Sequence, residues 1–414
     1  MNLFVLSWNY IKSKPLNTAL NILLMSLGIA IIMVLILLNS QLEESLGKNK
    51  RGVDLVVGAK GSPLQLILAN VYHIDFPTGN IKLNEAKALS RNRLIKKAIP
   101  LALGDNYQGF RIVGTNHDYY NLYQGTLGEG ALWQYNLEAT VGSNVAAKLN
   151  LSIGDTFAGS HGMSVSGMDH EGNDYEIVGI MESTGSVLDN LILTNVESVW
   201  MVHDHEGEEH DHDEDHEKML GSAYETGLPE GDEDDEITSM LLQFRSPLGA
   251  VQLPRMINSD TNMQAASPAF ETQRLFSLLG IGVDMLLAFA YIIVIISGLS
   301  IFISLYNALK DRKYDLAIMR SLGASQVKLF FHVIFEGIII TVLGGLIGLL
   351  LGHALMEGLA GLYEKSDDIG ITGFIFVNQE LYVLLIAVGV GVLASIIPAV
   401  NAYRTDISKV LADD

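Results

Sequence analysis

The sequence predicts an α-helical membrane protein with four transmembrane helices and a mixed α/β extracytoplasmic domain inserted between the first and second helices. The first observation is a set of four long apolar runs with almost no charge: Leu16–Leu38, Met285–Leu305, Val333–Leu351 and Leu381–Val400. At about 1.5 Å per residue, a helix of this length crosses a hydrocarbon core of roughly 30 Å. The second is the long stretch between the first two runs, where short β-rich segments alternate with Gly, Asn and Asp.

The apolar runs divide the chain into three parts. Residues 1–40 hold an N-terminal segment and the first transmembrane helix, residues 41–280 the extracytoplasmic domain, and residues 281–414 the other three helices. A low-complexity insert over 201–236 interrupts the domain, because it has too few apolar residues to fold by itself. Elsewhere in the domain we expect a helix over Asn84–Lys97, a helical stalk over Ser267–Gly280, and strands over Val53–Val57, Phe110–Val113, Tyr175–Ile180 and Leu191–Leu193.

Lysine and arginine next to the apolar runs indicate the orientation. They precede the first run, follow the fourth and crowd the loop 306–328, whereas the connection 353–380 has only Lys365. Both termini and this loop are therefore expected in the cytoplasm, and the large domain outside. The first run is too long for a cleaved signal peptide and lacks an A-x-A-like end, so we expect an uncleaved span. The basic residues concerned are Lys12, Lys14, Lys310, Arg312, Lys313, Arg320, Lys328, Arg404 and Lys409.

The formal net charge of -21 is concentrated in the insert. Its segment His203–Glu236 has sixteen Asp and Glu against Lys218 alone, and the rest of the chain is close to balanced. Because no basic field exists, we expect no nucleic-acid partner. The absence of cysteine excludes disulfides, thiolate metal sites and cysteine nucleophiles. No Ser/His/Asp or HExxH arrangement occurs either, so no catalytic residue is expected in this chain.

Histidines within the insert are candidate metal ligands. Five of them stand among nine carboxylates, and imidazole nitrogen with carboxylate oxygen suits Zn²⁺. The run lacks the defined spacing of a rigid site, so it would bind zinc loosely and exchangeably. The alternative is a solvated acidic linker in which the histidines are incidental. The candidate ligands are His203, His205, His210, His212 and His216.

A basic amphipathic stretch, Leu305–Leu329, follows the second run and reads LYNALKDRKYDLAIMRSLGASQVKL. Gly323 is placed to end a helix in the left-handed conformation, and Ser325 can cap the next helix through its hydroxyl. The prediction is a helix, a tight turn and a helix that enters the membrane, which together we call the elbow (residues 306–328). An interfacial helix that only rests at the headgroups is the alternative. Glu336, about one turn into the third run, is expected either to pack against another helix or to have a direct functional role.

At these residues the sequence resembles the MacB, LolC and FtsX group of ABC transporter permeases. The family's charged helix, its ALGAS-like phrase and its Gly-rich third span correspond to Asp315–Arg320, Ser321–Ser325 and Phe335–Gly348. The C-terminal Ile397–Leu411 is similar to the family's ending, with Ile407 in place of the usual Pro. The sequence also resembles blocks of the family's outer domain, at Phe110–Tyr123, Val141–Phe157 and Tyr175–Leu193.

The resemblance implies a MacB-like periplasmic core domain over 41–280 and an FtsX-like domain over 281–414, in the inner membrane of a bacterial cell. It implies a non-catalytic permease that couples ATP hydrolysis by a separate cytoplasmic ATPase dimer to movement of the outer domain. ATP and Mg²⁺ would bind that partner, since this chain has no GxxxxGK[ST] loop. The coupling residues carried over from the motif are Asp315, Arg320, Leu322, Gly323, Ala324 and Ser325.

Other expected partners are the lipid bilayer, a second permease copy in a homodimer or related heterodimer, and a periplasmic adaptor or substrate-binding protein. The work implied is export or extraction of a lipoprotein, lipid, peptide or small molecule, and the sequence does not choose among them. Two alternatives stay open. One is the permease of a zinc-linked ABC system that uses the histidine insert, and the other is an FtsX-like signalling subunit that controls a cell-wall hydrolase.

Overall fold

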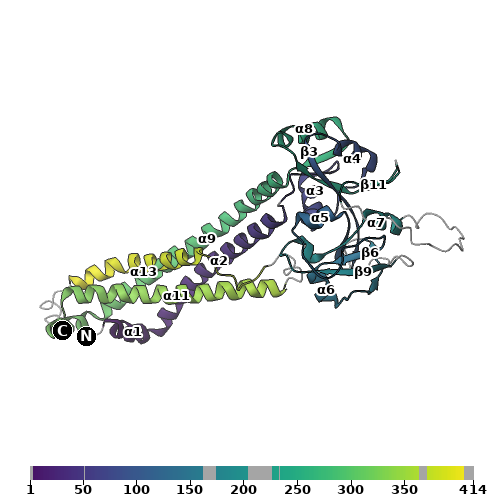
Figure 1. Ribbon diagram of the computed structural model, residues 1–414. Coiled ribbons are helices and arrows are strands. Elements are labelled where there is room, and N and C mark those ends of the chain that lie inside the picture. Colours follow the sequence, from purple (N-terminus) through teal and green to yellow (C-terminus); the bar gives the residue numbers. More distant parts are fainter. Residues whose placement is uncertain are drawn as a thin grey trace. The chain divides into compact units, whose positions relative to one another are not determined.

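The computed structural model describes residues 3–50, 52–161, 174–203, 226–232, 234–362 and 371–404. The chain forms two compact units, and Figure 1 shows the ribbon of both. Unit 1 comprises Met1–Leu42 with Leu279–Asp414, and unit 2 comprises Glu43–Leu278. The His-rich part of the insert lies outside the described residues: only the backbone of His203 is described, at the end of a helix.

Unit 1 is helical. Among the described residues, four helices are long and apolar enough to cross a membrane, which confirms the four predicted spans. One of them begins in unit 2 and includes the predicted stalk, since it continues without a break from Pro268 to Asp311. The helices of this unit are α1 (Leu3–Ser13), α2 (Pro15–Asn49), α9 (Pro268–Asp311), α10 (Lys313–Ser321), α11 (Gln326–Leu362) and α13 (Gln379–Tyr403), of which α2, α9, α11 and α13 are the candidate spans.

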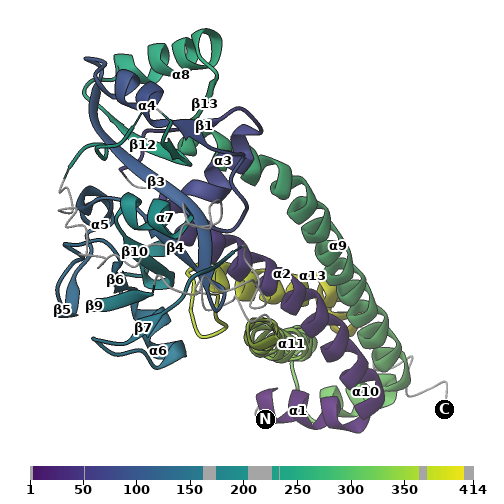
Figure 2. The same ribbon diagram turned by 90° about the vertical axis from the view of Figure 1, so that its right-hand side faces the viewer.

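Glycines on α11, which Figure 2 views almost end-on, allow α2 to approach closely. A Cβ atom added at Gly344 or Gly348 would lie 2.8 Å from side-chain atoms of α2, and one added at Gly352 would lie 2.6 Å away. These three residues are four apart, so they form one face of the helix. On another face, a Cβ added at Gly337 would lie 2.8 Å from the carbonyl oxygen of Gly391 in α13. The Gly-rich run of the sequence is therefore a packing surface for two neighbouring spans.

Unit 2 is mixed α/β, as predicted. In the part of the chain that the structure describes, its main sheet has eleven strands, in the order β13-β1-β12-β3-β4-β10-β6-β9-β5, with β7 paired to β9 and β8 paired to β3. A separate pair joins β11 to β2. The strands are β1 (Leu55–Ala59), β2 (Ile81–Lys82), β3 (Ile95–Tyr107), β4 (Phe110–Gly114), β5 (Leu127–Gly130), β6 (Glu138–Val141), β7 (Thr156–Phe157), β8 (Ser160–His161), β9 (Tyr175–Met181), β10 (Leu191–Thr194), β11 (Glu236–Ile237), β12 (Ser239–Phe244) and β13 (Met263–Ala266).

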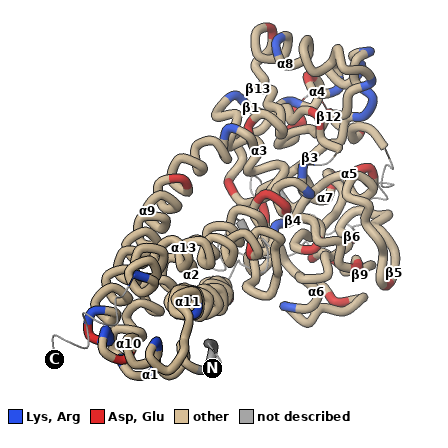
Figure 3. Tube along the Cα trace, turned by 90° about the vertical axis from the view of Figure 1, so that its left-hand side faces the viewer, with Lys and Arg blue, Asp and Glu red and all other residues tan. Residues whose placement is uncertain are grey.

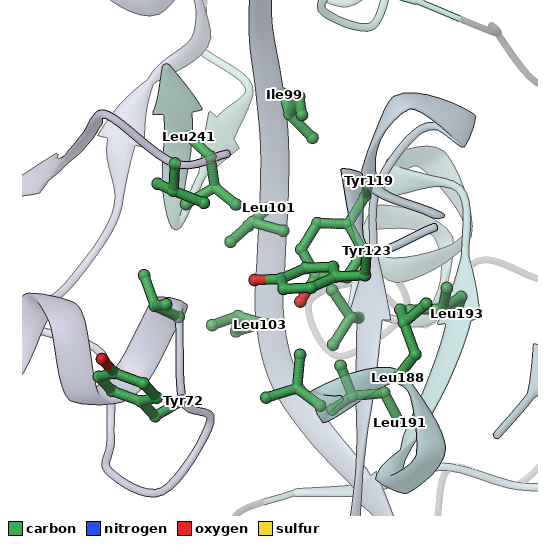
Figure 4. Close-up of a cluster of buried hydrophobic side chains, with 14 of the residues drawn as sticks. Tyr72, Ile99, Leu101, Leu103, Tyr119, Tyr123, Leu188, Leu191, Leu193 and Leu241 are labelled. Carbon is green, nitrogen blue, oxygen red and sulfur yellow. The ribbon is translucent and has the colours of Figure 1, made fainter. Parts of the chain in front are cut away.

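The long strand β3 connects the two halves of the main sheet and has a hydrophobic core on each face. Ile99, Leu101 and Leu103 join a cluster with Tyr72, Tyr119 and Tyr123, which Figure 4 shows. Ala98 and Ala102 face the other cluster, because successive side chains of a strand point to opposite faces. The helices of the unit are α3 (Pro63–Asn70), α4 (Leu83–Ser90), α5 (His117–Leu122), α6 (Ser143–Leu149), α7 (Val196–His203) and α8 (Leu248–Asp260), with a short 3₁₀ turn at Val187–Asn190.

The helix expected over Asn84–Lys97 is shorter than predicted. It ends at Ser90, and β3 begins at Ile95. Asn92 makes the turn between them, since its side-chain oxygen accepts a hydrogen bond from the backbone N–H of Leu94 at 3.0 Å. This local bond competes with the helical pattern, and pairing of Ile95 with Phe244 in β12 then fixes the extended conformation.

Candidate functional site

The elbow consists of the end of α9, the short helix α10 and the start of α11. Gly323 has φ +98°, the left-handed conformation expected of it. The N–H of Ala324 donates to the carbonyl of Met319 and the N–H of Gly323 to that of Arg320, each at 3.0 Å, which is a Schellman termination. Ser325 caps α11 by accepting a hydrogen bond from the N–H of Lys328 at 3.3 Å. Both predicted end signals of the elbow are therefore confirmed.

One face of α10 is buried against the membrane helices of unit 1. Leu316 is 4% exposed and Ala317 is fully buried. Leu316 belongs to a cluster formed with the first turns of α11 and the end of α13, whose other buried members are Leu329, Val333, Ile334, Ala399 and Ala402. Because α10 has only nine residues, this contact, rather than its intrinsic propensity, stabilises it.

Another face of α10 carries an exposed apolar stripe. Tyr314 is 47% exposed, Ile318 37% and Leu322 82%, and the three lie four residues apart. Asp315 is exposed beside them, and Arg320 is half-buried and engaged with the rest of the protein. Figure 3 shows Lys and Arg around α10 and α1, while the middle parts of the spans carry few charges. An exposed apolar stripe on a helix with one anchored face is suited to binding another protein.

A buried ionic cluster holds the junction between α9 and α10. Nη1 of Arg312 lies 3.5 Å from Oε1 of Glu336 in α11, and their side chains are 13% and 9% exposed. The guanidinium also stands 4.0 Å over the ring of Tyr10 and donates to Ser13 Oγ at 3.2 Å. Arg312 therefore links the α9–α10 junction to two helices, α1 and α11, in a setting where its charge is largely removed from water.

The first helix α1 is fastened to the same region by a second set of contacts. Oγ of Ser7, which is fully buried, lies 2.7 Å from Nδ1 of His332 in α11. The rings of Tyr10 and His332 are 5.3 Å apart, and Lys14 forms an ion pair with Asp311 at the end of α9. Ser7 and His332 are both buried, so their contact lies within the packing of the helices. These contacts join the N-terminal segment to α9 and α11.

Two family models match the chain. The FtsX-like permease C-terminal model matches residues 287–407, and the MacB-like periplasmic core domain model matches residues 18–221. The chain is an ABC transporter permease of the MacB and FtsX type. Its two matched regions correspond to the two parts expected from the sequence, the helical part with the elbow and the α/β domain.

Two curated relatives of this permease are named ABC transporter permeases, and a third is named an ATP-binding/permease protein. It is 28% identical over 181 residues, 41% of the chain, to an uncharacterized ABC transporter permease protein of Mycobacterium tuberculosis. It is 25% identical over 123 residues, 30% of the chain, to one of Methanocaldococcus jannaschii, and 27% identical over 128 residues, 31% of the chain, to the macrolide export ATP-binding/permease protein MacB of Nitrobacter winogradskyi. The matches span 19%, 31% and 19% of the length of these relatives.

Two solved structures are also similar to the permease. The crystal structure of the periplasmic region of MacB from Actinobacillus actinomycetemcomitans is 13% identical, with a TM-score of 0.34, covering 56% of this chain and 97% of that one. The extracellular domain of the noncanonic ABC-type transporter YknZ from Gram-positive bacteria is 12% identical, with a TM-score of 0.30, covering 52% and 99%.

The structure places the candidate site residues of the permease in different settings. Those of the elbow lie together, with Leu322, Gly323 and Ser325 at the turn. Glu336 faces Arg312, which in the sequence stands out only as one of the basic residues that indicate the orientation. No pattern in the sequence indicates that pair, because its members lie on different elements. Four of the candidate zinc ligands, His205, His210, His212 and His216, lie outside the described residues, as does the side chain of His203, and the described part of the chain holds no group of three or more potential metal ligands.

Proposed function

We propose that the elbow receives a separate cytoplasmic ATPase and that the permease couples ATP hydrolysis there to movement of its large domain. The observation that supports this most is the exposed stripe of Tyr314, Ile318 and Leu322 on a helix whose other face is buried. A docking surface that transmits movement must keep its conformation and its contacts when the partner moves. The Schellman turn and the Arg312–Glu336 pair meet that requirement, since they fix both ends of α10.

Continuity of α9 supports the second half of the proposal. This helix of 44 residues begins at Pro268, within unit 2, and ends at Asp311, next to Arg312 of the ionic cluster. At about 1.5 Å per residue it is roughly 66 Å long. A displacement of the elbow would therefore pass along one unbroken helix into the large domain. Export or extraction of a lipoprotein, lipid, peptide or small molecule, with a second permease copy and an extracytoplasmic adaptor or substrate-binding protein, belongs to the same proposal.

The proposed orientation places the elbow and both termini in the cytoplasm. It is supported by the Lys and Arg around α10 and α1. The chain has no cysteine, so a single Ser321→Cys variant reports the side directly. We expect an impermeant maleimide to label it only in inverted vesicles. Labelling from the outside of intact cells would refute this topology.

Coupling is tested at Gly323. A β-branched residue at φ +98° is strained by about 1–3 kcal/mol, so Gly323→Val should distort the turn. Apart from its two chain neighbours, no described residue has an atom within 4 Å of a Cβ built there, so the backbone conformation is the main cause of any effect. The expected result is a membrane-inserted complex in which ATP hydrolysis no longer drives movement of the large domain. Gly323→Asn, which tolerates positive φ better, is the matched control and should retain more coupling. Normal coupling in the Val variant would contradict the assigned role.

Docking is tested separately at the stripe. Ile318→Glu places a charge in the proposed ATPase contact and should abolish co-purification of the ATPase with the permease. Val251→Glu is the control, because Val251 is 73% exposed on α8 of unit 2. If the Ile318 variant still retains the ATPase, the stripe is not the docking surface.

Metal binding by the insert is a second proposal, supported by its five histidines among carboxylates. Imidazoles with an ordinary pKa near 6.5 are mostly neutral at pH 7.5 and protonated at pH 5.5, so zinc affinity should fall over that interval. Zinc titration of the permease is compared with a variant in which all five histidines are Asn. Equal uptake by the two proteins would remove the metal proposal, and with it the zinc-linked alternative.

A further inference from the structure

The connection between α11 and α13 is described from Ile371 onward, and its backbone is bonded to side chains of three spans. Gln41 of α2 makes two hydrogen bonds with Thr372: its Nε2 donates to the carbonyl at 2.9 Å, and its Oε1 accepts from the N–H at 2.8 Å. Oε2 of Glu357 in α11 accepts from the N–H of Gly373 at 2.8 Å. Oε1 of Glu380 in α13 accepts from the N–H of Val377 at 2.8 Å.

Further hydrogen bonds belong to this arrangement. Nδ1 of His353 lies 2.6 Å from the carbonyl oxygen of Gly373, and the N–H of Phe374 donates to Oγ1 of Thr372 at 3.2 Å. Non-helical backbone is tolerated at membrane depth only where its polar groups are satisfied by protein. A loop in water has no such need, because solvent satisfies its amides. The bonded amides of Thr372, Gly373, Phe374 and Val377 therefore suit a segment that leaves bulk water.

Helix positions give the depth of this loop. Gln41 lies just beyond the first apolar run, which ends at Leu38, and Glu380 immediately precedes the fourth. His353 and Glu357 follow the third run, which ends at Leu351, by less than two turns. At about 1.5 Å per residue these anchors lie within roughly 9 Å of the hydrocarbon boundary. The headgroup layer on each side is about 5–8 Å thick, so the loop lies at its level.

The side chains that the loop presents outward are aromatic. Phe374 is 77% exposed and Phe376 is 79% exposed, although the backbone on either side is anchored. Other exposed apolar residues stand at the ends of the two helices that the loop joins: Leu355 and Leu359 of α11, and Leu381 and Tyr382 of α13. Both helices are candidate membrane spans, so an apolar loop between their ends suits contact with lipid.

We propose that Ile371–Val377 is a preformed lipid-contacting loop that inserts Phe374 and Phe376 into the headgroup layer on the side of the large domain. That side follows from chain order, since α9 leaves the domain and α11 returns. Burial of the two rings sets the depth of the α11–α13 pair, and the bonds from Gln41, Glu357 and Glu380 prevent the loop from withdrawing. The inference concerns lipid contact alone and requires no ATPase.

Quenching in nanodiscs tests the proposal with the full chain. Single-cysteine variants Phe374→Cys and Phe376→Cys, labelled with a fluorophore, are exposed in turn to phosphatidylcholine carrying a nitroxide near the headgroup and to a water-soluble quencher. Leu385→Cys, on the exposed face of α13 inside the span, is the lipid control, and Ile74→Cys, 55% exposed in unit 2, is the aqueous control.

We expect lipid quenching at both loop positions to be comparable with that at Leu385 and several-fold above that at Ile74. Adding Gln41→Ala, which removes two bonds to Thr372, should increase aqueous quenching of the label in the Phe376→Cys variant while leaving the Leu385→Cys variant unchanged. Aqueous quenching alone at the loop would overturn the proposal. Protection from both quenchers would also overturn it, because protein, such as a second permease copy, would then cover the rings.

Discussion

Replacing Glu336 by Gln tests whether the buried ion pair holds the elbow against the membrane helices. The substitution keeps the size of the side chain and removes its charge. Arg312 would then remain in a site where it is only 13% exposed, with the Tyr10 ring and Ser13 as its other contacts. Removing one member of a buried pair costs about 3–5 kcal/mol, and these remaining contacts favour the lower end, about 3 kcal/mol.

Undocking of α10 can be measured with a cysteine placed on its buried face. Ala317 is fully buried, so an Ala317→Cys variant reacts with a maleimide only when the helix opens. Where reclosing is faster than labelling, the rate follows the opening equilibrium. About 3 kcal/mol then corresponds to a roughly hundredfold faster reaction in the Glu336→Gln background, since about 1.4 kcal/mol is tenfold. Ser321→Cys, on the exposed side of the same helix, should react equally fast in both backgrounds.

Pairing itself is tested by adding Arg312→Gln. If the two charges act as a pair, the double variant should label no faster than the Arg312→Gln or Glu336→Gln variant alone, because removal of one partner already loses the interaction. An unchanged labelling rate of the Ala317→Cys reporter in the Glu336→Gln background would refute the reasoning, as would single effects that multiply in the double variant.

Three other predictions concern packing and pH. Gly348→Ala should lower the stability of the helical unit by about 1–3 kcal/mol, because the added Cβ would lie 2.8 Å from atoms of α2. Gly358→Ala is the control, since the space around Gly358 is open. Equal melting temperatures of the two variants in detergent would contradict the packing. Tyr72→Phe removes a hydroxyl 2.7 Å from Oγ1 of Thr272 and should lower the stability of this contact by about 1 kcal/mol. The measurement is hydrogen exchange in the first turns of α9, which should become faster. Unchanged exchange would count against the prediction. Burial raises the pKa of Glu197 to about 7, above its ordinary value of 4.5, so its contribution to stability is present below pH 4.5 and lost as the pH rises through 7. Glu197→Gln should remove that part of the decline in thermal stability between pH 5 and 8, and an identical profile would disprove it.

Features decided by neighbouring residues could be predicted from the sequence. Four spans follow from length and apolarity alone, since a bilayer imposes a single requirement on each helix. The turn of the elbow follows from Gly323 and Ser325, because helix ends are satisfied by groups within a few positions. The helix expected over Asn84–Lys97 was cut short because pairing with β12, distant in the sequence, outweighed the local periodicity.

Tertiary structure alone decided which polar groups meet. Burial dictates that a charge such as Glu336 needs a partner, but helix periodicity fixes only the face on which it lies and not the helix that it meets. Arg312 is that partner, and the ring of Tyr10 lies against its guanidinium. The packing of α1 and α10 against α11 brings the three residues together. The same holds for Gln41, whose hydrogen bonds to Thr372 join opposite ends of the chain and depend on α2 reaching the glycine face of α11.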